Sequence, residues 1–156
     1  MKVLIPGSFD PPTFGHLDII SRSIEIFDEV MIGVVSNPSK QTMFDSKIRI
    51  EMLKENILLE KLTKVEVKEF SGLLIEFAKL ENIDVIVKGV RAMTDFDYEF
   101  QMAQVNKDLD ALETLFVPAK PEYGYISSSL VKELYRLDGD VSGFVPKSVL
   151  ERLQND

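Results

Sequence analysis

The sequence contains no cysteine and no long apolar run. The lack of cysteine excludes disulfide bonds and thiolate metal sites, and it favours a reducing compartment such as the cytoplasm. No apolar run approaches the roughly 20 residues of a membrane-spanning helix. The apolar start Met1–Ile5 runs directly into Pro6 and Gly7, which is unlike a signal peptide. We therefore expect one cytoplasmic domain over residues 1–156, with no membrane partner.

Positive charge is also scarce, because 18 lysines and arginines stand against 26 aspartates and glutamates and leave a net charge of −8. Proteins that bind DNA or RNA usually present a basic face, so we expect no nucleic-acid partner. An acidic protein also repels a polyanion such as ATP at long range. If it binds one, its few cations must converge on one spot. The candidates are Lys40, Lys88, Arg91 and Lys132.

Strand and helix patterns alternate along the whole chain. Short apolar runs and, at 65–70, an alternating pattern predict five strands, at 2–5, 29–35, 65–70, 84–87 and 113–117. The first predicted helix contains Leu17–Phe27, the second follows a cap at Asp45 or Ser46, and the next two span 73–80 and 95–109. The fifth follows a cap at Ser127 or Ser128 and ends at Gly139 as the C′ residue, and the last starts at Pro146. This order predicts an α/β fold: a Rossmann-like, doubly wound sheet of five parallel strands with helices on both faces, plus C-terminal helices.

The loops that follow the five strands carry most of the polar candidates. In doubly wound sheets, ligands bind beyond the carboxyl ends of the strands, near the switch in strand order. Loops at one edge of a sheet lie close together, so we expect a single crevice there. The loops concerned are 8–16, 36–40, 71–74, 88–91 and 123–129.

The loop Pro6–His16 is the most informative of these. It is dense in turn formers and ends in the only histidine, directly after Gly15 and where a helix should start. Backbone N–H groups, the positive end of a helix dipole and an imidazole then share one target, which suits a phosphate ester. Ser8 offers a hydroxyl and an N–H, and Phe9 offers an N–H. Asp10 is expected to stabilise its own turn through its side chain.

Other candidates allow two interpretations each. His16 is expected to donate a hydrogen bond to a phosphate oxygen, although a lone histidine is more often structural. Lys40 is either a solvated loop lysine or a contact to an acceptor phosphate. Lys88 and Arg91 form a cationic turn after the fourth strand. The acids of Asp95–Glu99 are explained equally well by the helix dipole and by a nucleotide contact, and they do not resemble a metal site.

Three successive hydroxyls, Ser127, Ser128 and Ser129, stand at the start of a predicted helix. Helix capping requires one of them, so the other two suit a triphosphate bound at the helix N-terminus. The first loop has neither the glycine pattern of a dinucleotide site nor a Walker A sequence. These residues therefore favour nucleotidyl transfer by a site of another kind.

Two motifs carry a resemblance to a known superfamily. Thr13-x-Gly15-His16 resembles the (T/H)xGH signature of the nucleotidylyltransferases, and Ile126–Ser129 resembles their ISSTxxR-type segment, with Lys132 where the signature usually ends. Within the superfamily the chain looks like the bacterial phosphopantetheine adenylyltransferases over about residues 2–150. The segments that match are 6–11, 37–40, 88–92, 95–99, 126–132 and 139–141.

The resemblance implies an enzyme of coenzyme A biosynthesis that transfers AMP from ATP to 4′-phosphopantetheine. It implies Mg²⁺ bound mainly through ATP phosphates, a homohexamer and feedback binding of CoA. Its catalytic residues would be His16, Lys40 and Ser8. Its acceptor contacts would be Ser8, Lys40, Leu74 and Lys88, with lysine at 88 where the family usually has arginine. Its ATP contacts would be Ser8, Phe9, His16, Gly89, Val90, Arg91, Glu99, Tyr123, Gly124, Tyr125, Ile126, Ser127, Ser128 and Ser129.

Three alternatives stay open at this point. The acceptor could be nicotinate mononucleotide or glycerol 3-phosphate. The chain could be a regulator that binds a nucleotide without turnover. It could also be a flavodoxin-like interaction domain whose serines and histidine are incidental.

Overall fold

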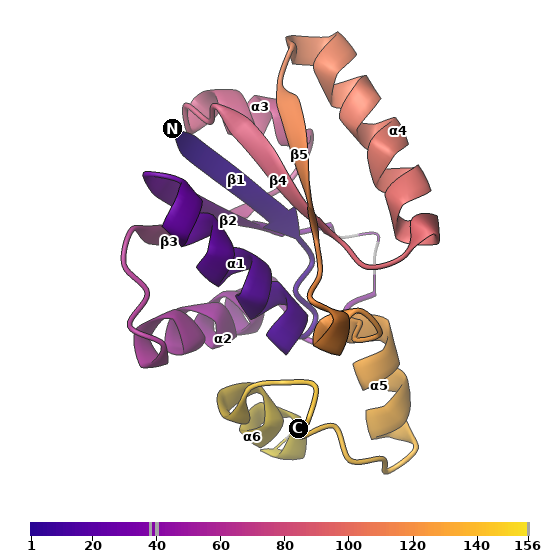
Figure 1. Cartoon of the computed structure of the whole chain (residues 1–156). Coiled ribbons are helices and arrows are strands. Elements are labelled where there is room, and N and C mark those ends of the chain that lie inside the picture. Colours follow the sequence, from indigo (N-terminus) through magenta and orange to yellow (C-terminus); the bar gives the residue numbers. More distant parts are fainter. Residues whose placement is uncertain (38, 40, 156) are drawn as a thin grey trace.

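The computed structural model of the chain describes residues 1–37, 39 and 41–155, apart from the side chain of Thr94. Five strands form one parallel sheet in the order β3-β2-β1-β4-β5 (Figure 1). This confirms the predicted fold class. The strands are β1 (Lys2–Gly7), β2 (Glu29–Val35), β3 (Val65–Phe70), β4 (Val85–Val90) and β5 (Glu113–Pro118).

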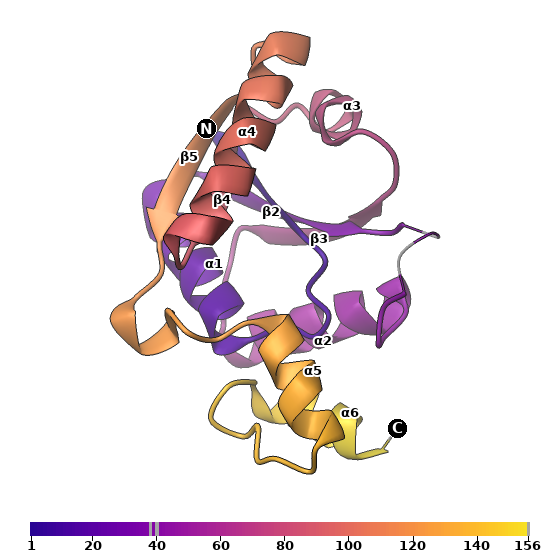
Figure 2. The same cartoon turned by 90° about the vertical axis from the view of Figure 1, so that its right-hand side faces the viewer.

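Six α-helices and one short 3₁₀ helix connect and follow the strands in the described residues. Helices α1 and α2 cover one face of the sheet, and α3 and α4 lie together on the other, while α5 and α6 follow beyond the sheet (Figures 1 and 2). None of these helices has both the length and the apolar character needed to span a membrane. Their bounds are α1 (Phe14–Ile26), α2 (Ser46–Leu59), α3 (Leu74–Leu80), α4 (Met93–Asp110), η1 (Pro121–Tyr123), α5 (Ser128–Arg136) and α6 (Lys147–Asn155).

Alternation within the strands builds a separate core on each face. In β1, Val3 and Ile5 pack with the apolar side of α1 and α2, whereas Leu4 points the other way and packs with α3. Successive residues of a strand face opposite sides, so a strand buried on both faces is apolar throughout. A third cluster, which includes Val131 of α5 and Val149 and Leu153 of α6, joins the C-terminal helices to α2.

The strand order reverses at β1, which has β2 on one side and β4 on the other. Next to β2, β1 is paired along its whole length. Next to β4, it pairs only Val3 with Val85 and Leu4 with Ile86. The two strands therefore part toward their carboxyl ends, and this gap at the switch point is where a ligand site is expected.

One strand boundary differs from the sequence-based prediction in a way that affects the site. Lys88 and Gly89 were predicted to form a turn after the fourth strand, but they lie within β4, where they pair with Phe116 and Val117 of β5. The residue at this strand position is a glycine because α1 packs closely over it: a Cβ atom there would lie 2.9 Å from Cγ1 of Ile19. The glycine marks a close approach between elements and not the end of a strand.

Helix ends confirm two predicted caps and correct two other predictions. The side chains of Asp45 and Ser127 cap α2 and α5. At the end of α5, however, Asp138 and not Gly139 occupies the left-handed C′ position, with a φ of 57°. The N–H of Gly139 donates to the carbonyl of Leu134, as the C″ residue does in a Schellman motif. Pro146 directly precedes α6 instead of forming its first residue.

Candidate active site

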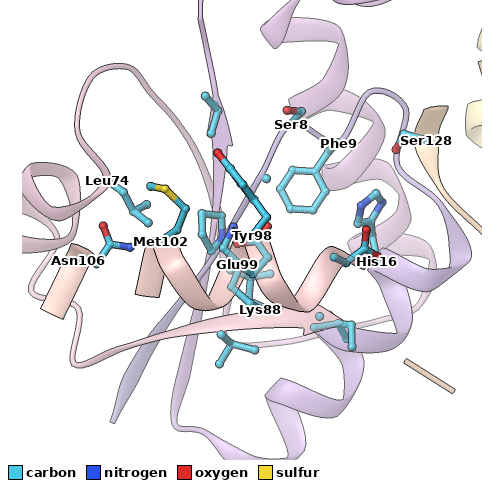
Figure 3. Close-up of a pocket in the computed structure, with 18 of the residues that line it drawn as sticks. Ser8, Phe9, His16, Leu74, Lys88, Tyr98, Glu99, Met102, Asn106 and Ser128 are labelled. Atoms are coloured by element: carbon cyan, nitrogen blue, oxygen red, sulfur yellow. Dashed lines mark ion pairs between the residues drawn. The ribbon is translucent and has the colours of Figure 1, made fainter. Parts of the chain in front are cut away.

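A cleft of about 970 Å³ opens where β1 and β4 part. His16 and Ser8 lie toward one end, and Leu74, Met102 and Asn106 toward the other (Figure 3). Each of the five predicted loop regions contributes described residues to its wall, and the last region contributes only from Ile126 onward. The predicted convergence on one crevice is therefore confirmed for these segments.

The N-terminal turn of α1 holds the imidazole of His16. Thr13 caps the helix, and its backbone N–H donates to Nδ1 of His16 at 3.0 Å. Because Nδ1 accepts this hydrogen bond, the proton of the neutral ring is on Nε2. The ring of Phe9 packs against the imidazole with its centroid 4.9 Å away. The cleft thus has a neutral N–H donor held in a fixed orientation.

Burial, together with the smaller effect of the nearby positive charge of Arg91, lowers the pKa of His16 to about 4. Both causes disfavour the imidazolium form. At neutral pH the residue is therefore uncharged. It can donate a hydrogen bond to an oxygen on which negative charge develops, but it has no spare proton to give up as an acid.

The lowered pKa of His16 makes the stability of the protein depend on pH. In the unfolded chain a histidine takes up a proton near pH 6.5, whereas in the fold it does so only near pH 4. Between these values the unfolded state binds more protons, so the free energy of unfolding falls as the pH drops, by at most about 3 kcal/mol. Denaturant titrations at several pH values between 6.5 and 4 should show that the free energy of unfolding falls less with decreasing pH in His16→Gln than in the wild type. Equal falls in the two proteins would contradict the assignment.

Two ion pairs join the end of β4 and the residue after it to α4 in the wall of the cleft. Nζ of Lys88 lies 3.1 Å from a carboxylate oxygen of Glu99, and Nη2 of Arg91 lies 3.0 Å from one of Asp95 (the first pair is in Figure 3). Arg91 also donates to the backbone carbonyl of Ile126 at 2.8 Å. The guanidinium is thus braced against the segment that leads into α5.

The three serines at the start of α5 all line the cleft. The hydroxyl of Ser127 caps the helix, and that of Ser128 donates to the carbonyl of Pro11 at 2.7 Å. Two of the three hydroxyls are therefore used inside the protein, which is more than the sequence-based prediction allowed. The backbone N–H groups of the helix start remain suited to an anion.

Asp10 was predicted to stabilise its own turn. Its side chain instead joins three distant parts of the chain. Its carboxylate is 3% exposed. It accepts hydrogen bonds from the N–H groups of Met43 and Phe44, both at 2.9 Å, and pairs with Nζ of Lys132 at 2.9 Å. Lys132, predicted as one of the converging cations, is therefore bound to Asp10 and does not line the cleft.

Arg49 is a positioning residue that the sequence analysis missed. It is 2% exposed, and its guanidinium donates to the carbonyls of Ser8 at 2.5 Å, Val35 at 3.0 Å and Phe44 at 3.1 Å. These bonds join the loops that follow β1 and β2. The only sequence signal is an arginine on a helix next to apolar positions, which more often indicates a solvated residue.

The predicted site residues are brought together in large part. Those that line the cleft are Ser8, Phe9, His16, Leu74, Lys88, Gly89, Arg91, Glu99, Ile126, Ser127, Ser128 and Ser129. Those placed beside it and not in its wall are Val90, Tyr123, Gly124 and Tyr125. Lys40 lies outside the described residues. Besides Glu99, six residues of α4 line the cleft that were not among the predicted site residues, namely Asp95, Tyr98, Met102, Val105, Asn106 and Leu109.

Comparison with known proteins agrees with this fold and shows the family. The cytidylyltransferase-like family model matches residues 4–134, which defines the class of protein. The chain is 51% identical to a phosphopantetheine adenylyltransferase of Caldanaerobacter subterraneus subsp. tengcongensis, over 98% of this chain and 96% of that protein. It is 47% identical to one of Streptomyces coelicolor, over 97% and 94% respectively. The chain belongs to the phosphopantetheine adenylyltransferase family.

A solved structure shows the same fold at lower sequence identity. It is that of a putative nicotinate-nucleotide adenylyltransferase from Vibrio parahaemolyticus, with a TM-score of 0.72 and 18% identity, covering 99% of this chain and 91% of that one. At this identity the match supports the architecture alone. The family assignment rests on the closer relatives.

Proposed function

We propose that the protein transfers the AMP group of ATP to the phosphate of 4′-phosphopantetheine, giving dephospho-CoA and pyrophosphate. The observation that carries this proposal is one cleft with two unlike ends. His16, Arg91 and the start of α5 contribute to a polar region, and Leu74 and Met102 to an apolar one. A triphosphate suits the polar region and an extended pantetheine arm the apolar one. Relatives named for this acceptor support the same reaction. The protein would act in coenzyme A biosynthesis.

The acceptor supplies its own nucleophile in this reaction. A phosphate monoester has a second pKa of about 6, so it is largely a dianion at neutral pH and needs no general base. One of its oxygens attacks the α-phosphorus of ATP in line. The new O–P bond forms as the bond from the α-phosphorus to the bridging oxygen breaks, and its electron pair leaves with pyrophosphate. The protein contributes positioning and electrostatic stabilisation.

We assign the contacts to the two reacting phosphates to His16, Ser8 and Lys40. The Nε2–H of His16 would donate to an α-phosphate oxygen, where negative charge increases in the transition state. Ser8 and Lys40 would align the acceptor phosphate, with Lys88 as a second cation. The remaining nucleotide contacts are assigned to Phe9, Gly89, Val90, Arg91, Glu99, Tyr123, Gly124, Tyr125, Ile126, Ser127, Ser128 and Ser129.

The apolar region of the cleft is assigned to the pantetheine arm. Leu74 begins α3, and Met102, Val105 and Leu109 of α4 face the same space. Asn106 lies among them and is 7% exposed. An arm with two amide groups between methylene segments matches a wall that is mainly apolar and carries one carboxamide.

Mg²⁺ is proposed to bind mainly through ATP phosphates. The carboxylates that line the described part of the cleft, Asp95 and Glu99, already pair with cations. The hard oxygens that Mg²⁺ prefers would then come from the nucleotide and from water. When bound, the ion would neutralise charge on the leaving pyrophosphate. Among the protein side chains, Arg91 would neutralise charge on the pyrophosphate.

The test is release of pyrophosphate from ATP with three acceptors in turn. We expect release with 4′-phosphopantetheine, and little with nicotinate mononucleotide or glycerol 3-phosphate. Release with another acceptor but not with phosphopantetheine would overturn the proposed substrate. ATP binding by calorimetry without turnover on any acceptor would instead indicate a regulator. Absence of any thermal shift with ATP would favour an interaction domain.

Assembly, feedback and location are further parts of the proposal. Exposed apolar side chains on α4 and the edge strand β5 support a homohexamer, since patches of this kind mark contact surfaces. They are Met93, Phe100 and Leu115, none of which lines the cleft. Light scattering should give six times the mass of one chain. CoA contains the phosphopantetheine arm and would compete for the same cleft in the cytoplasm.

A further inference from the structure

The two cations in the described part of the cleft wall, Lys88 and Arg91, are both paired with carboxylates of α4. The carboxylates, Glu99 and Asp95, are four residues apart and so lie on the same side of the helix. A phosphate group that approaches either cation therefore meets a site already occupied by an internal anion. This matters in a protein of net charge −8, where little positive charge is available elsewhere.

The Arg91 pair has a geometry that allows exchange. Nη1 of Arg91 is held by the carbonyl of Ile126 at 2.8 Å, and Nη2 contacts Asp95 at 3.0 Å. The side chain of Asp95 is 35% exposed, so it can turn toward solvent without leaving a buried charge. An exposed pair of this kind contributes only about 0.2–1 kcal/mol. A phosphate, with more charge and three acceptor oxygens, can therefore replace the carboxylate while the bond to Ile126 keeps the guanidinium in place.

We propose that Asp95 is an internal competitor for the phosphate site at Arg91, and that it sets how tightly this site holds ATP and pyrophosphate. The inference rests on the proposed function. Asp95 acts through Arg91 and is a positioning residue rather than a catalytic one. When pyrophosphate leaves, the carboxylate returns to the guanidinium and opposes rebinding of the product. The affinity for phosphate groups that bind elsewhere in the cleft does not depend on this exchange.

The proposal predicts that removing the charge of Asp95 strengthens nucleotide binding, whereas a purely structural role would predict weaker binding. If Asp95 only oriented Arg91, then Asp95→Asn would weaken nucleotide binding. If Asp95 competes, the same substitution frees Arg91, and we expect ATP and pyrophosphate to bind about 2- to 5-fold more tightly, the size of one exposed ion pair. KM for ATP and the inhibition constant of pyrophosphate should fall together. The dissociation constant of 4′-phosphopantetheine should stay within error.

Asp97→Asn is the matched control. Asp97 is exposed on the same helix, two residues away, and the substitution removes the same charge without breaking a described ion pair. Tighter binding in both variants would show a general effect of net charge and would overturn the proposal. Asp95→Glu keeps the carboxylate and should restore wild-type affinity. Asp95→Ser, which retains a residue that favours helix starts, should tighten binding like Asp95→Asn.

Calorimetric titration with ATP and with pyrophosphate decides the outcome, with circular dichroism to check that each variant is folded. Tighter binding in Asp95→Asn and Asp95→Ser but not in Asp97→Asn supports the proposal. Unchanged or weaker binding in the two Asp95 variants contradicts it. If the wild type itself binds neither compound, the proposed function fails, and that result is visible before any variant is compared.

Discussion

His16→Ala should lower the turnover number for dephospho-CoA formation by at least about 10²-fold, because it removes a hydrogen-bond donor to the transition state. The lost group is the Nε2–H whose direction is set by the hydrogen bond from Thr13 to Nδ1. The substituted side chain is neutral before and after the change, since the pKa of His16 is about 4. The loss therefore reflects one directed hydrogen bond and not a missing charge. Pyrophosphate release under saturating ATP and acceptor measures it.

His16→Gln is the control for this interpretation. Its amide nitrogen can occupy the region of Nε2 and donate a hydrogen bond, so it should retain more turnover than alanine. Both variants should leave the far-ultraviolet circular dichroism unchanged, because Thr13 still caps α1 with its own side chain. A folded His16→Ala protein with near-normal turnover would remove His16 from the mechanism.

Much of the fold could be predicted because each element has a local signal. The bounds of β2 and β3 match the predicted 29–35 and 65–70 because β-branched residues dominate the first run, apolar and charged residues alternate at the start of the second, and turn formers follow both. The parallel arrangement followed from the alternation of strands and helices. The location of the cleft then followed from the strand order, since loops at the carboxyl ends meet at the switch point.

The boundary of β4 shows where local signals fail. Lys88 and Gly89 look like the end of a strand, because glycine is unfavourable inside one. The strand continues because β5 pairs with it up to Val90. The small size of Gly89 is required by Ile19, which is 70 residues away in the sequence and nearby only in the folded chain. A tertiary contact therefore overrides the local preference.

The ion pairs of the site could not be predicted from the sequence, because they too depend on tertiary contacts. Lys88, Arg91 and Lys132 were predicted to converge on one spot, which is confirmed for Lys88 and Arg91 and wrong for Lys132, and the ion-pair partners of all three could not be chosen from composition. Lys132 pairs with a carboxylate 122 residues away. Spacing within one helix allowed Asp95 and Glu99 to be placed near each other, yet the two cations they contact come from β4 and the residue after it.

Asp10→Ala should lower the free energy of unfolding by about 3–5 kcal/mol, the usual cost of removing one partner of a buried ion pair. The carboxylate is 3% exposed and binds the N–H groups of Met43 and Phe44 together with Lys132. Without it, the buried N–H of Phe44, the half-buried N–H of Met43 and a half-buried ammonium lose their partner at once. Denaturant unfolding at neutral pH measures the loss.

A double variant separates the charge from the backbone contacts. Lys132→Met alone leaves Asp10 with its two N–H donors and should cost less than Asp10→Ala, since the carboxylate stays hydrogen-bonded. Adding Lys132→Met to Asp10→Ala removes the unpaired ammonium and should recover part of the stability. If the double variant is as unstable as the sum of the single ones, then the ion pair contributes nothing beyond its separate halves. In that case the loop that carries Ser8 and His16 is held to α5 by other contacts, such as the hydrogen bond from Ser128 to Pro11.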